Sequence, residues 1–143
     1  MRLSTKARYA ARAMTELALH YGGDPVKLKD IASSQDISIK YLEQLMYPLR
    51  TGNFVKTQKG SRGGYSLSRP PEDVTLYDIV YCVEGSLAPV DCVDNQQACD
   101  RVDLCVTRNV WARVHDAIIK ELKSTTLAAL AEEQGHIYTE AGI

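Results

Sequence analysis

The fold is decided by two segments, Val26-Lys-Leu-Lys-Asp-Ile-Ala-Ser33 and Ser38-Ile-Lys-Tyr-Leu-Glu-Gln-Leu-Met-Tyr47. Each places apolar residues at intervals of three and four, and Ser38 is a good N-cap for the second. Two short helices joined by the polar break at 34–36 predict a helix-turn-helix. A plain helical hairpin with a polar outer face fits the same pattern. If the two helices form a helix-turn-helix, the outward face of the second helix would read base edges in a major groove. That face holds Ser38, Lys40, Tyr41, Glu43, Gln44 and Tyr47.

A β-hairpin with a basic tip is predicted directly after these helices. Asn53-Phe-Val-Lys-Thr-Gln58 and Tyr65-Ser-Leu-Ser68 have the length and composition of short strands, and Lys59-Gly-Ser-Arg-Gly-Gly64 connects them. The glycines allow backbone conformations that other residues resist, so Lys59 and Arg62 would project toward phosphates or into a minor groove. A helix-turn-helix followed by such a hairpin predicts a winged helix, mainly α with a small β-hairpin wing.

The charge of the chain is unevenly distributed. Residues 1–69 carry 12 Lys/Arg and 5 Asp/Glu, a net charge of +7, whereas residues 70–143 carry 5 and 13, a net charge of −8. A compact basic half favours a polyanionic partner such as double-stranded DNA, although a merely solvated basic face gives the same count.

Three of the four cysteines lie on one polar loop, Cys92-Val-Asp-Asn-Gln-Gln-Ala-Cys99-Asp-Arg-Val-Asp-Leu-Cys105. Thiolates suit zinc, copper(I) and iron-sulfur clusters, and no two of these cysteines have the close spacing of a zinc knuckle. An iron-sulfur cluster is larger than a zinc ion and accepts ligands spread along the chain, so the spacing favours a cluster, while zinc, a thiol redox sensor and plain unpaired cysteines stay open. Cys82 lies beside the apolar stripe of a helix capped by Thr75, and we interpret it as a small core residue.

Two helical patterns flank these regions. The first runs from Ser4 to about Tyr21, and the second from about Thr107 to Ser124. One small domain offers little to cover the apolar stripe of the second, so we expect it to pack against its copy in a homodimer, which would match a two-fold DNA site. A short final helix should begin at Thr126. The stripe comprises Trp111, Val114, Ile118 and Leu122.

Other protein classes are disfavoured. No apolar run is long enough to span a membrane, and the N-terminus lacks the apolar core of a signal peptide, so we expect a cytoplasmic protein. No nucleophile–base pair, phosphate loop or paired carboxylates with a pocket are apparent. We therefore expect no enzymatic activity and no small-molecule substrate.

Four motifs of the chain form a recognisable combination: Met1-Arg-Leu-Ser-Thr-Lys-Ala-Arg-Tyr-Ala10, Tyr41-Leu-Glu-Gln-Leu45, Gly63-Gly-Tyr-Ser-Leu67 and the cysteine loop before a Trp-containing helix. Together they resemble the IscR family of iron-sulfur-cluster regulators, whose superfamily also holds the nitric-oxide sensor NsrR and the cysteine-metabolism regulator CymR. The resemblance covers nearly the whole chain to about Ala131. It implies a homodimeric winged-helix transcription factor with one 2Fe-2S cluster per subunit on Cys92, Cys99 and Cys105.

One position departs from the IscR pattern. The resemblance places a histidine ligand three residues after the third cysteine, where this chain has Arg108, and a guanidinium has no lone pair to offer. NsrR-like relatives use an aspartate on the first helix, where this chain has Arg8. The fourth ligand therefore stays open among a group from the partner subunit, an exogenous thiol and the loop carboxylates Asp91, Asp94 and Asp103.

The expected organisation is a DNA-binding domain over 1–85, a cluster loop over 86–106, a dimerisation helix with a short final helix over 107–131, and a flexible tail over 132–143. Lys40, Tyr41, Glu43 and Gln44 are the expected base-reading set. The expected function is a DNA-binding transcriptional regulator of iron-sulfur biogenesis genes, a repressor or an activator, whose operator binding is modulated by the 2Fe-2S cluster. The alternatives are a thiol- or zinc-based redox or nitric-oxide sensor, and an interaction protein that docks on a biosynthetic enzyme.

Overall fold

The computed structural model describes residues 2–143. Its helix-turn-helix consists of α2 (Leu28–Gln35) and α3 (Ile39–Thr51). Asp36 ends α2 in the left-handed region with φ 52°, and the Ser38 hydroxyl caps α3 by accepting from the Tyr41 amide at 3.2 Å. The cap is therefore confirmed. The first helix starts two residues later than the predicted Val26, because Val26 pairs with the wing instead.

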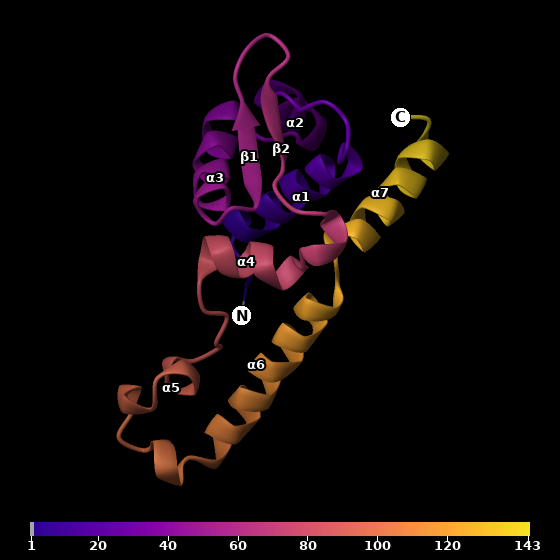
Figure 1. The fold of residues 1–143 in the computed structure, drawn as a ribbon. Coiled ribbons are helices and arrows are strands. Elements are labelled where there is room, and N and C mark those ends of the chain that lie inside the picture. Colours follow the sequence, from indigo (N-terminus) through magenta and orange to yellow (C-terminus); the bar gives the residue numbers. More distant parts are fainter. Residues whose placement is uncertain (1) are drawn as a thin grey trace.

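The wing is an antiparallel hairpin of β1 (Val55–Gln58) and β2 (Gly64–Leu67), with Val55 opposite Leu67. Val26 and Tyr65 exchange two backbone hydrogen bonds of 2.8 and 2.7 Å, which attach the hairpin to the start of the helix-turn-helix. Gly64 makes this contact feasible, because a Cβ there would lie 2.4 Å from the Val26 carbonyl oxygen. The predicted winged helix is confirmed, and the wing projects from the body beside α3 (Figure 1).

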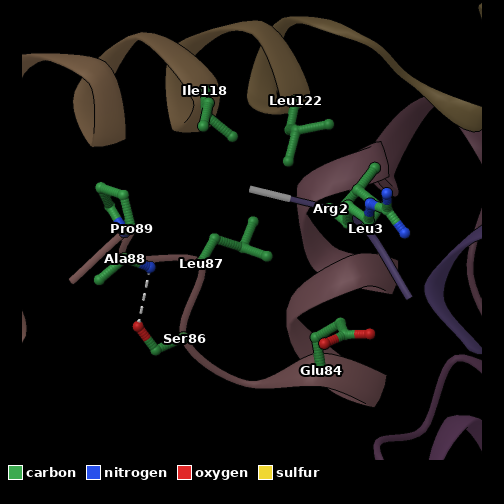
Figure 2. Close-up of a pocket in the computed structure, with 9 residues that line it drawn as sticks. All are labelled: Arg2, Leu3, Glu84, Ser86, Leu87, Ala88, Pro89, Ile118 and Leu122. Atoms are coloured by element: carbon green, nitrogen blue, oxygen red, sulfur yellow. Dashed lines mark hydrogen bonds between the residues drawn. The ribbon is translucent and has the colours of Figure 1, made fainter. Parts of the chain in front are cut away.

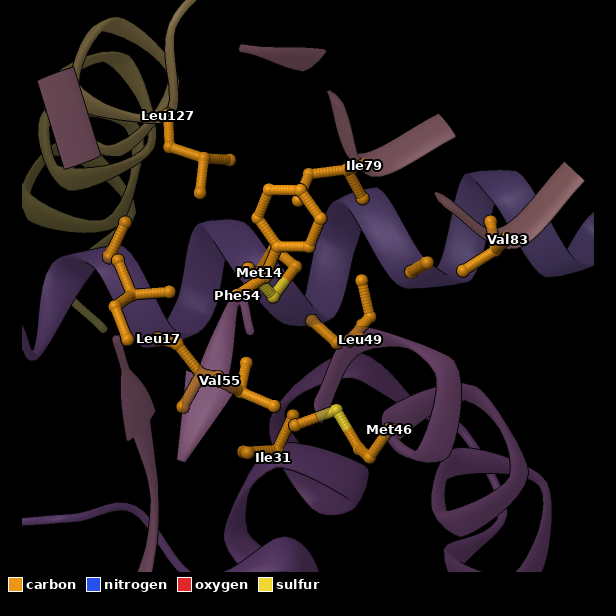
Figure 3. Close-up of a cluster of buried hydrophobic side chains, with 14 of the residues drawn as sticks. Met14, Leu17, Ile31, Met46, Leu49, Phe54, Val55, Ile79, Val83 and Leu127 are labelled. Carbon is orange, nitrogen blue, oxygen red and sulfur yellow. The ribbon is translucent and has the colours of Figure 1, made fainter. Parts of the chain in front are cut away.

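The core lies around α1 (Thr5–Leu19), whose N-cap is Ser4, with its hydroxyl accepting from the Ala7 amide at 3.0 Å. Apolar side chains from α1, α2, α3, the hairpin and α4 (Leu76–Glu84) meet on it, as Figure 3 shows. Fully buried members include Met14, Leu42, Leu49 and Ile79. This burial holds α3 on a rigid base.

The cysteine loop contains the one-turn helix α5 (Asp91–Asp94) and two 3-10 turns, Gln96–Ala98 and Val102–Leu104. It leads into α6 (Val106–Ser124), which extends away from the body in Figure 1. At its other end the chain rejoins the body through backbone pairing. Thr75 and Thr126 form an isolated β-bridge, with the Leu127 amide donating to the Val74 carbonyl at 2.8 Å.

The final helix α7 (Leu127–Ala141) is longer than predicted, and the prediction of a flexible tail over 132–143 was wrong for residues 132–141. Thr126 caps α7 as expected, but the helix continues because it packs along α1. Leu127 and Ala131 are buried there, and the Tyr138 hydroxyl contacts Glu16 and Gln35. Across residues 2–143, no helix has the length and apolar character needed to cross a membrane.

Candidate functional site

The exposed face of α3 carries most of the predicted base-reading residues. Lys40, Glu43 and Gln44 are exposed, and Tyr47 is 75% exposed at the far end of the row. Ser38 is exposed too, although its hydroxyl is engaged as the N-cap. The fold thus leaves a row of donors and acceptors free on one helix, the arrangement that fits a major groove.

Tyr41 differs from this row. It is half-buried, and its ring meets Tyr9 of α1 edge-on with centroids 5.9 Å apart. Tyr9 in turn lies under the Arg12 guanidinium, 5.2 Å from its ring centroid. Tyr41 therefore anchors the first turn of α3 to α1, and its ring is not free to lie wholly in a groove.

The wing tip presents the two predicted cations. Lys59 and Arg62 are exposed on the turn between β1 and β2. The hairpin that carries this turn lies next to α3 in Figure 1. Arg69, another cation of the basic half, has a structural role at the base of the hairpin. Its guanidinium donates to the Gly52 carbonyl at 3.3 Å and lies 4.4 Å from the centroid of the Phe54 ring.

The cysteine loop lies at the end of the molecule opposite the wing tip (Figure 1). Cys92 and Cys105 are half-buried, and Cys99 is exposed. Within the described chain, no three His, Cys, Asp or Glu side chains come close enough together to bind one metal ion. The thiol donor set suits a cluster, but this loop conformation does not gather the three predicted ligands, and the loop would have to close around one.

Arg108 makes a specific contact in this loop. Its Nε donates to the Cys92 carbonyl at 2.9 Å, which ties α5 to the first turns of α6. Of the carboxylates considered as fourth ligands, Asp94 accepts a hydrogen bond from the Ser86 hydroxyl, whereas Asp91 and Asp103 are exposed. The Arg108 guanidinium thus acts near Cys92 as a side-chain donor to a backbone carbonyl, a role that needs no lone pair.

The thiols differ in acidity. The pKa of Cys105 is lowered, first by a hydrogen bond with the Thr107 hydroxyl at 3.2 Å and then by the Arg108 backbone amide. Burial raises the pKa of Cys82, whose thiol donates to the Pro48 carbonyl at 3.3 Å and packs against the core. Cys105 has the more reactive setting, and Cys82 behaves as the predicted core residue.

The helix α6 leaves much apolar surface uncovered. None of its residues is buried, and Val106 is 78%, Val110 40% and Trp111 41% exposed. Where α6 faces the end of α4, Ile118 and Leu122 line a hollow of about 370 Å³ (Figure 2). An exposed stripe of this length favours covering by another protein surface.

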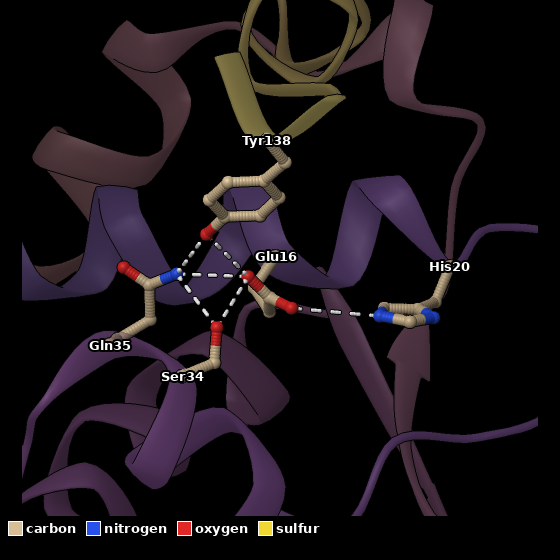
Figure 4. A network of polar contacts seen from close by, with 5 residues as sticks. All are labelled: Glu16, His20, Ser34, Gln35 and Tyr138. Atoms are coloured by element: carbon tan, nitrogen blue, oxygen red, sulfur yellow. Dashed lines mark hydrogen bonds and ion pairs between the residues drawn. The ribbon is translucent and has the colours of Figure 1, made fainter. Parts of the chain in front are cut away.

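Sequence reasoning missed a polar network where α1, α2 and α7 meet (Figure 4). Glu16 is only 8% exposed, and its Oε2 accepts from Ser34, Gln35 and Tyr138 at 3.1, 2.9 and 3.3 Å. One signal was present, because Tyr138 continues the helical spacing of Leu127 and Ala131.

Comparison with known proteins gives consistent relatives. The Rrf2 family, described as an iron-dependent transcriptional regulator, matches residues 3–133. Protein rrf2 of Nitratidesulfovibrio vulgaris is 38% identical over 93% of this chain and 89% of its own length. The regulator CymR of Bacillus subtilis is 40% identical over 92% of this chain and 90% of its own length. IscR of Photorhabdus laumondii is 36% identical over 94% of this chain and 81% of its own length.

Solved structures agree. CymR, titled the global cysteine regulator of B. subtilis, superposes with a TM-score of 0.80 at 38% identity, covering 93% of this chain and 98% of that one. IscR of T. potens superposes with a TM-score of 0.78 at 40% identity, covering 94% of this chain and 88% of that one. These relatives are regulators, which confirms the expectation that the chain is not an enzyme. With its winged helix, exposed α3 row and basic wing tip, the chain belongs to the Rrf2 family of DNA-binding transcriptional regulators.

Proposed function

We propose that the protein is a homodimeric regulator whose operator binding is modulated by a 2Fe-2S cluster on Cys92, Cys99 and Cys105, and that it controls iron-sulfur biogenesis genes. The observation that carries this proposal is that three thiols share the one loop that leads into the uncovered helix α6. The iron dependence in the family's description supports it. A bound cluster would supply a cross-link between the three thiolates.

The chain's own residues explain how the loop would act at a distance. The loop and the reading surface lie at opposite ends of one subunit, so direct contact within a subunit is not the route (Figure 1). Loop closure beside α6 would instead change how two α6 helices pack, and thereby the separation of the two α3 helices. Half-sites are about 34 Å apart, so small changes in that separation alter affinity.

We assign base reading to Lys40, Glu43 and Gln44, and phosphate or minor-groove contacts to Lys59 and Arg62. Glu43 repels phosphates yet can accept from cytosine N4, so it acts as a filter against wrong sites more than as a source of affinity. Arg62→Ala should weaken binding to all duplexes and reduce its salt dependence, whereas Gln44→Ala should relax sequence preference. Footprints unchanged by both substitutions would contradict the assignment.

The cluster is tested on protein purified without oxygen. Visible absorbance with about one 2Fe-2S per subunit is expected, and it should be lost on replacing any one of the three loop cysteines. Cys82→Ala is the matched control, because that thiol donates to Pro48 in the core and should leave the spectrum unchanged. Colourless protein holding stoichiometric zinc after reconstitution with iron and sulfide would overturn the proposal.

A thiol-based sensor is the second candidate. The lowered pKa of Cys105 and the exposure of Cys99 favour it, since a thiolate is the species that oxidants attack. Its signature would be operator binding that responds to peroxide in metal-free protein and is insensitive in Cys105→Ser.

A further inference from the structure

A buried carboxylate joins three helices. Glu16 of α1 is the acceptor for Ser34 and Gln35 at the end of α2 and for Tyr138 near the end of α7 (Figure 4). Its other oxygen lies 3.6 Å from His20 Nε2. Burying a carboxylate is costly unless donors satisfy it, so this site holds the three helices in one relative arrangement.

Gln35 is the centre of this network and the last residue of α2. Its side-chain amide donates to Glu16 at 2.9 Å and to the Tyr138 hydroxyl at 3.2 Å. Its side-chain oxygen accepts from Arg12 Nε at 3.1 Å, and Arg12 also donates to its backbone carbonyl. Gln35 immediately precedes Asp36, the left-handed residue that turns the chain toward α3. The turn of the helix-turn-helix is therefore fixed from α1 and α7 together.

The same contacts reach the recognition helix itself. Arg12, which holds Gln35, also covers the Tyr9 ring at 5.2 Å, and Tyr9 meets Tyr41 edge-on. Tyr41 lies in the first turn of α3, next to the exposed Lys40. A shift of Gln35 would thus disturb both the turn before α3 and the aromatic contact under its first turn.

We propose that Tyr138 is a positioning residue for operator recognition, acting through Gln35 on the placement of α3. The helix α7 lies outside the helix-turn-helix and the wing, and its Tyr138 hydroxyl both accepts from Gln35 and donates to Glu16. This role goes beyond the proposed cluster switch, because it requires no metal and no cysteine.

Tyr138→Phe removes only that hydroxyl. The operator probe is a duplex that the wild-type protein selects from a random-sequence pool. An unrelated duplex of equal length measures non-specific affinity. At a temperature where circular dichroism shows both proteins fully folded, we expect operator affinity to fall about three- to tenfold. Non-specific affinity should stay unchanged, because phosphate contacts tolerate small shifts of α3.

Amide exchange gives a readout without DNA. The Ile37 amide donates to the Ala32 carbonyl at 2.9 Å in the turn, and its exchange should rise at least about threefold in Tyr138→Phe. Tyr21→Phe is the control. It deletes a hydroxyl from a 48% exposed tyrosine just beyond α1 and should change neither readout.

A double-mutant cycle tests the route through Gln35. In a Gln35→Ala background, Tyr138→Phe should change operator affinity by less than about twofold, since the hydroxyl then keeps only its bond to Glu16 and has lost the side chain through which it acts on the turn. The inference is overturned if Tyr138→Phe binds the operator like wild type, if both duplexes are weakened equally, or if the two substitutions are additive. Colourless protein would defeat the cluster proposal and leave these results interpretable.

Discussion

At the residue scale, Arg108 occupies the position of the histidine ligand in the IscR pattern and has a different role there. Its Nε bond to the Cys92 carbonyl tethers the loop to α6 through the backbone, independently of the Cys92 thiol. We expect Arg108→Ala to speed proteolysis within residues 91–105 about fivefold, since one hydrogen bond contributes about 1 kcal/mol.

Limited proteolysis with mass spectrometry measures this effect. Arg113→Ala is the control, because Arg113 is an exposed residue of the same helix. Equal cleavage in Arg108→Ala and Arg113→Ala would show that the tether does not restrain the loop.

The two half-buried thiols Cys105 and Cys82 should titrate differently. A lowered pKa leaves more thiolate on Cys105 at neutral pH, so metal-free protein should be alkylated there first, with a rate that falls as pH drops below that pKa. The raised pKa of Cys82 means that its alkylation should become appreciable only at higher pH. Site-resolved iodoacetamide rates between about pH 6 and 11 measure both, since the ordinary cysteine pKa of about 8.5 lies between the two shifted values. Alkylation of Cys82 as fast as Cys105 near neutrality would contradict this ranking.

Local sequence predicted some residue roles and not others. The caps Ser38 and Thr75 were predictable, because capping depends on residues within one turn. The half-burial of Tyr41 was not, because it depends on contact with Tyr9, 32 positions earlier in the chain. Helical periodicity places Tyr41 on the outer face of α3, but it does not show that Tyr9 of α1 packs against this face.

At the scale of elements, the wing depends on a close approach of two backbones. Gly64→Ala would place a Cβ 2.4 Å from the Val26 carbonyl oxygen, so β2 would have to separate from the start of the helix-turn-helix. We expect a loss of more than about 1 kcal/mol in the free energy of unfolding, measured by urea titration. Gly23→Ala is the control, since its nearest atom would be the His20 carbonyl oxygen at 3.4 Å. Equal midpoints would contradict the packing argument.

The extent of α7 was the main error at this scale. Glu132, Glu133 and Gln134 are good helix formers, and only Gly135 in this stretch lowers the helix propensity, so the sequence was compatible with the helix that docking on α1 stabilises. Gly135 faces Leu19 of α1, where a Cβ would lie at an ordinary contact distance of 3.7 Å, so the docking does not depend on a glycine at this position. The winged helix itself was predictable, since its elements follow each other directly in sequence.

At the scale of the whole molecule, the uncovered helix α6 predicts association. Val106, Val110 and Ala117 are exposed and recur on one face. Val110→Glu should weaken a dimer at least tenfold, because the carboxylate would be buried without a partner. Analytical ultracentrifugation measures this. Asn109→Glu, which adds the same charge at an adjacent exposed position, should leave the association unchanged. A wild-type monomer at micromolar concentration would contradict the prediction.

The grouping of the cysteines was the part of the candidate site that sequence could not predict. Spacing limits which metals three thiols suit, but whether they converge depends on the loop conformation, and this structure keeps Cys99 exposed. The opposite charges of the two halves were visible in the sequence, and they match a molecule with its basic reading surface at one end and its loop at the other (Figure 1).

The backbone bridge between Thr75 and Thr126 makes α6 a lever arm. The 19 residues of the helix span about 28 Å, so a rotation of about 5° at the bridge moves its far end by about 2.5 Å. Conversely, a displacement of that size at the loop reaches the body as a small angular change at a pivot adjoining both α4 and α7. A large displacement of the cysteine loop therefore corresponds to a small rotation at the start of α4 and α7.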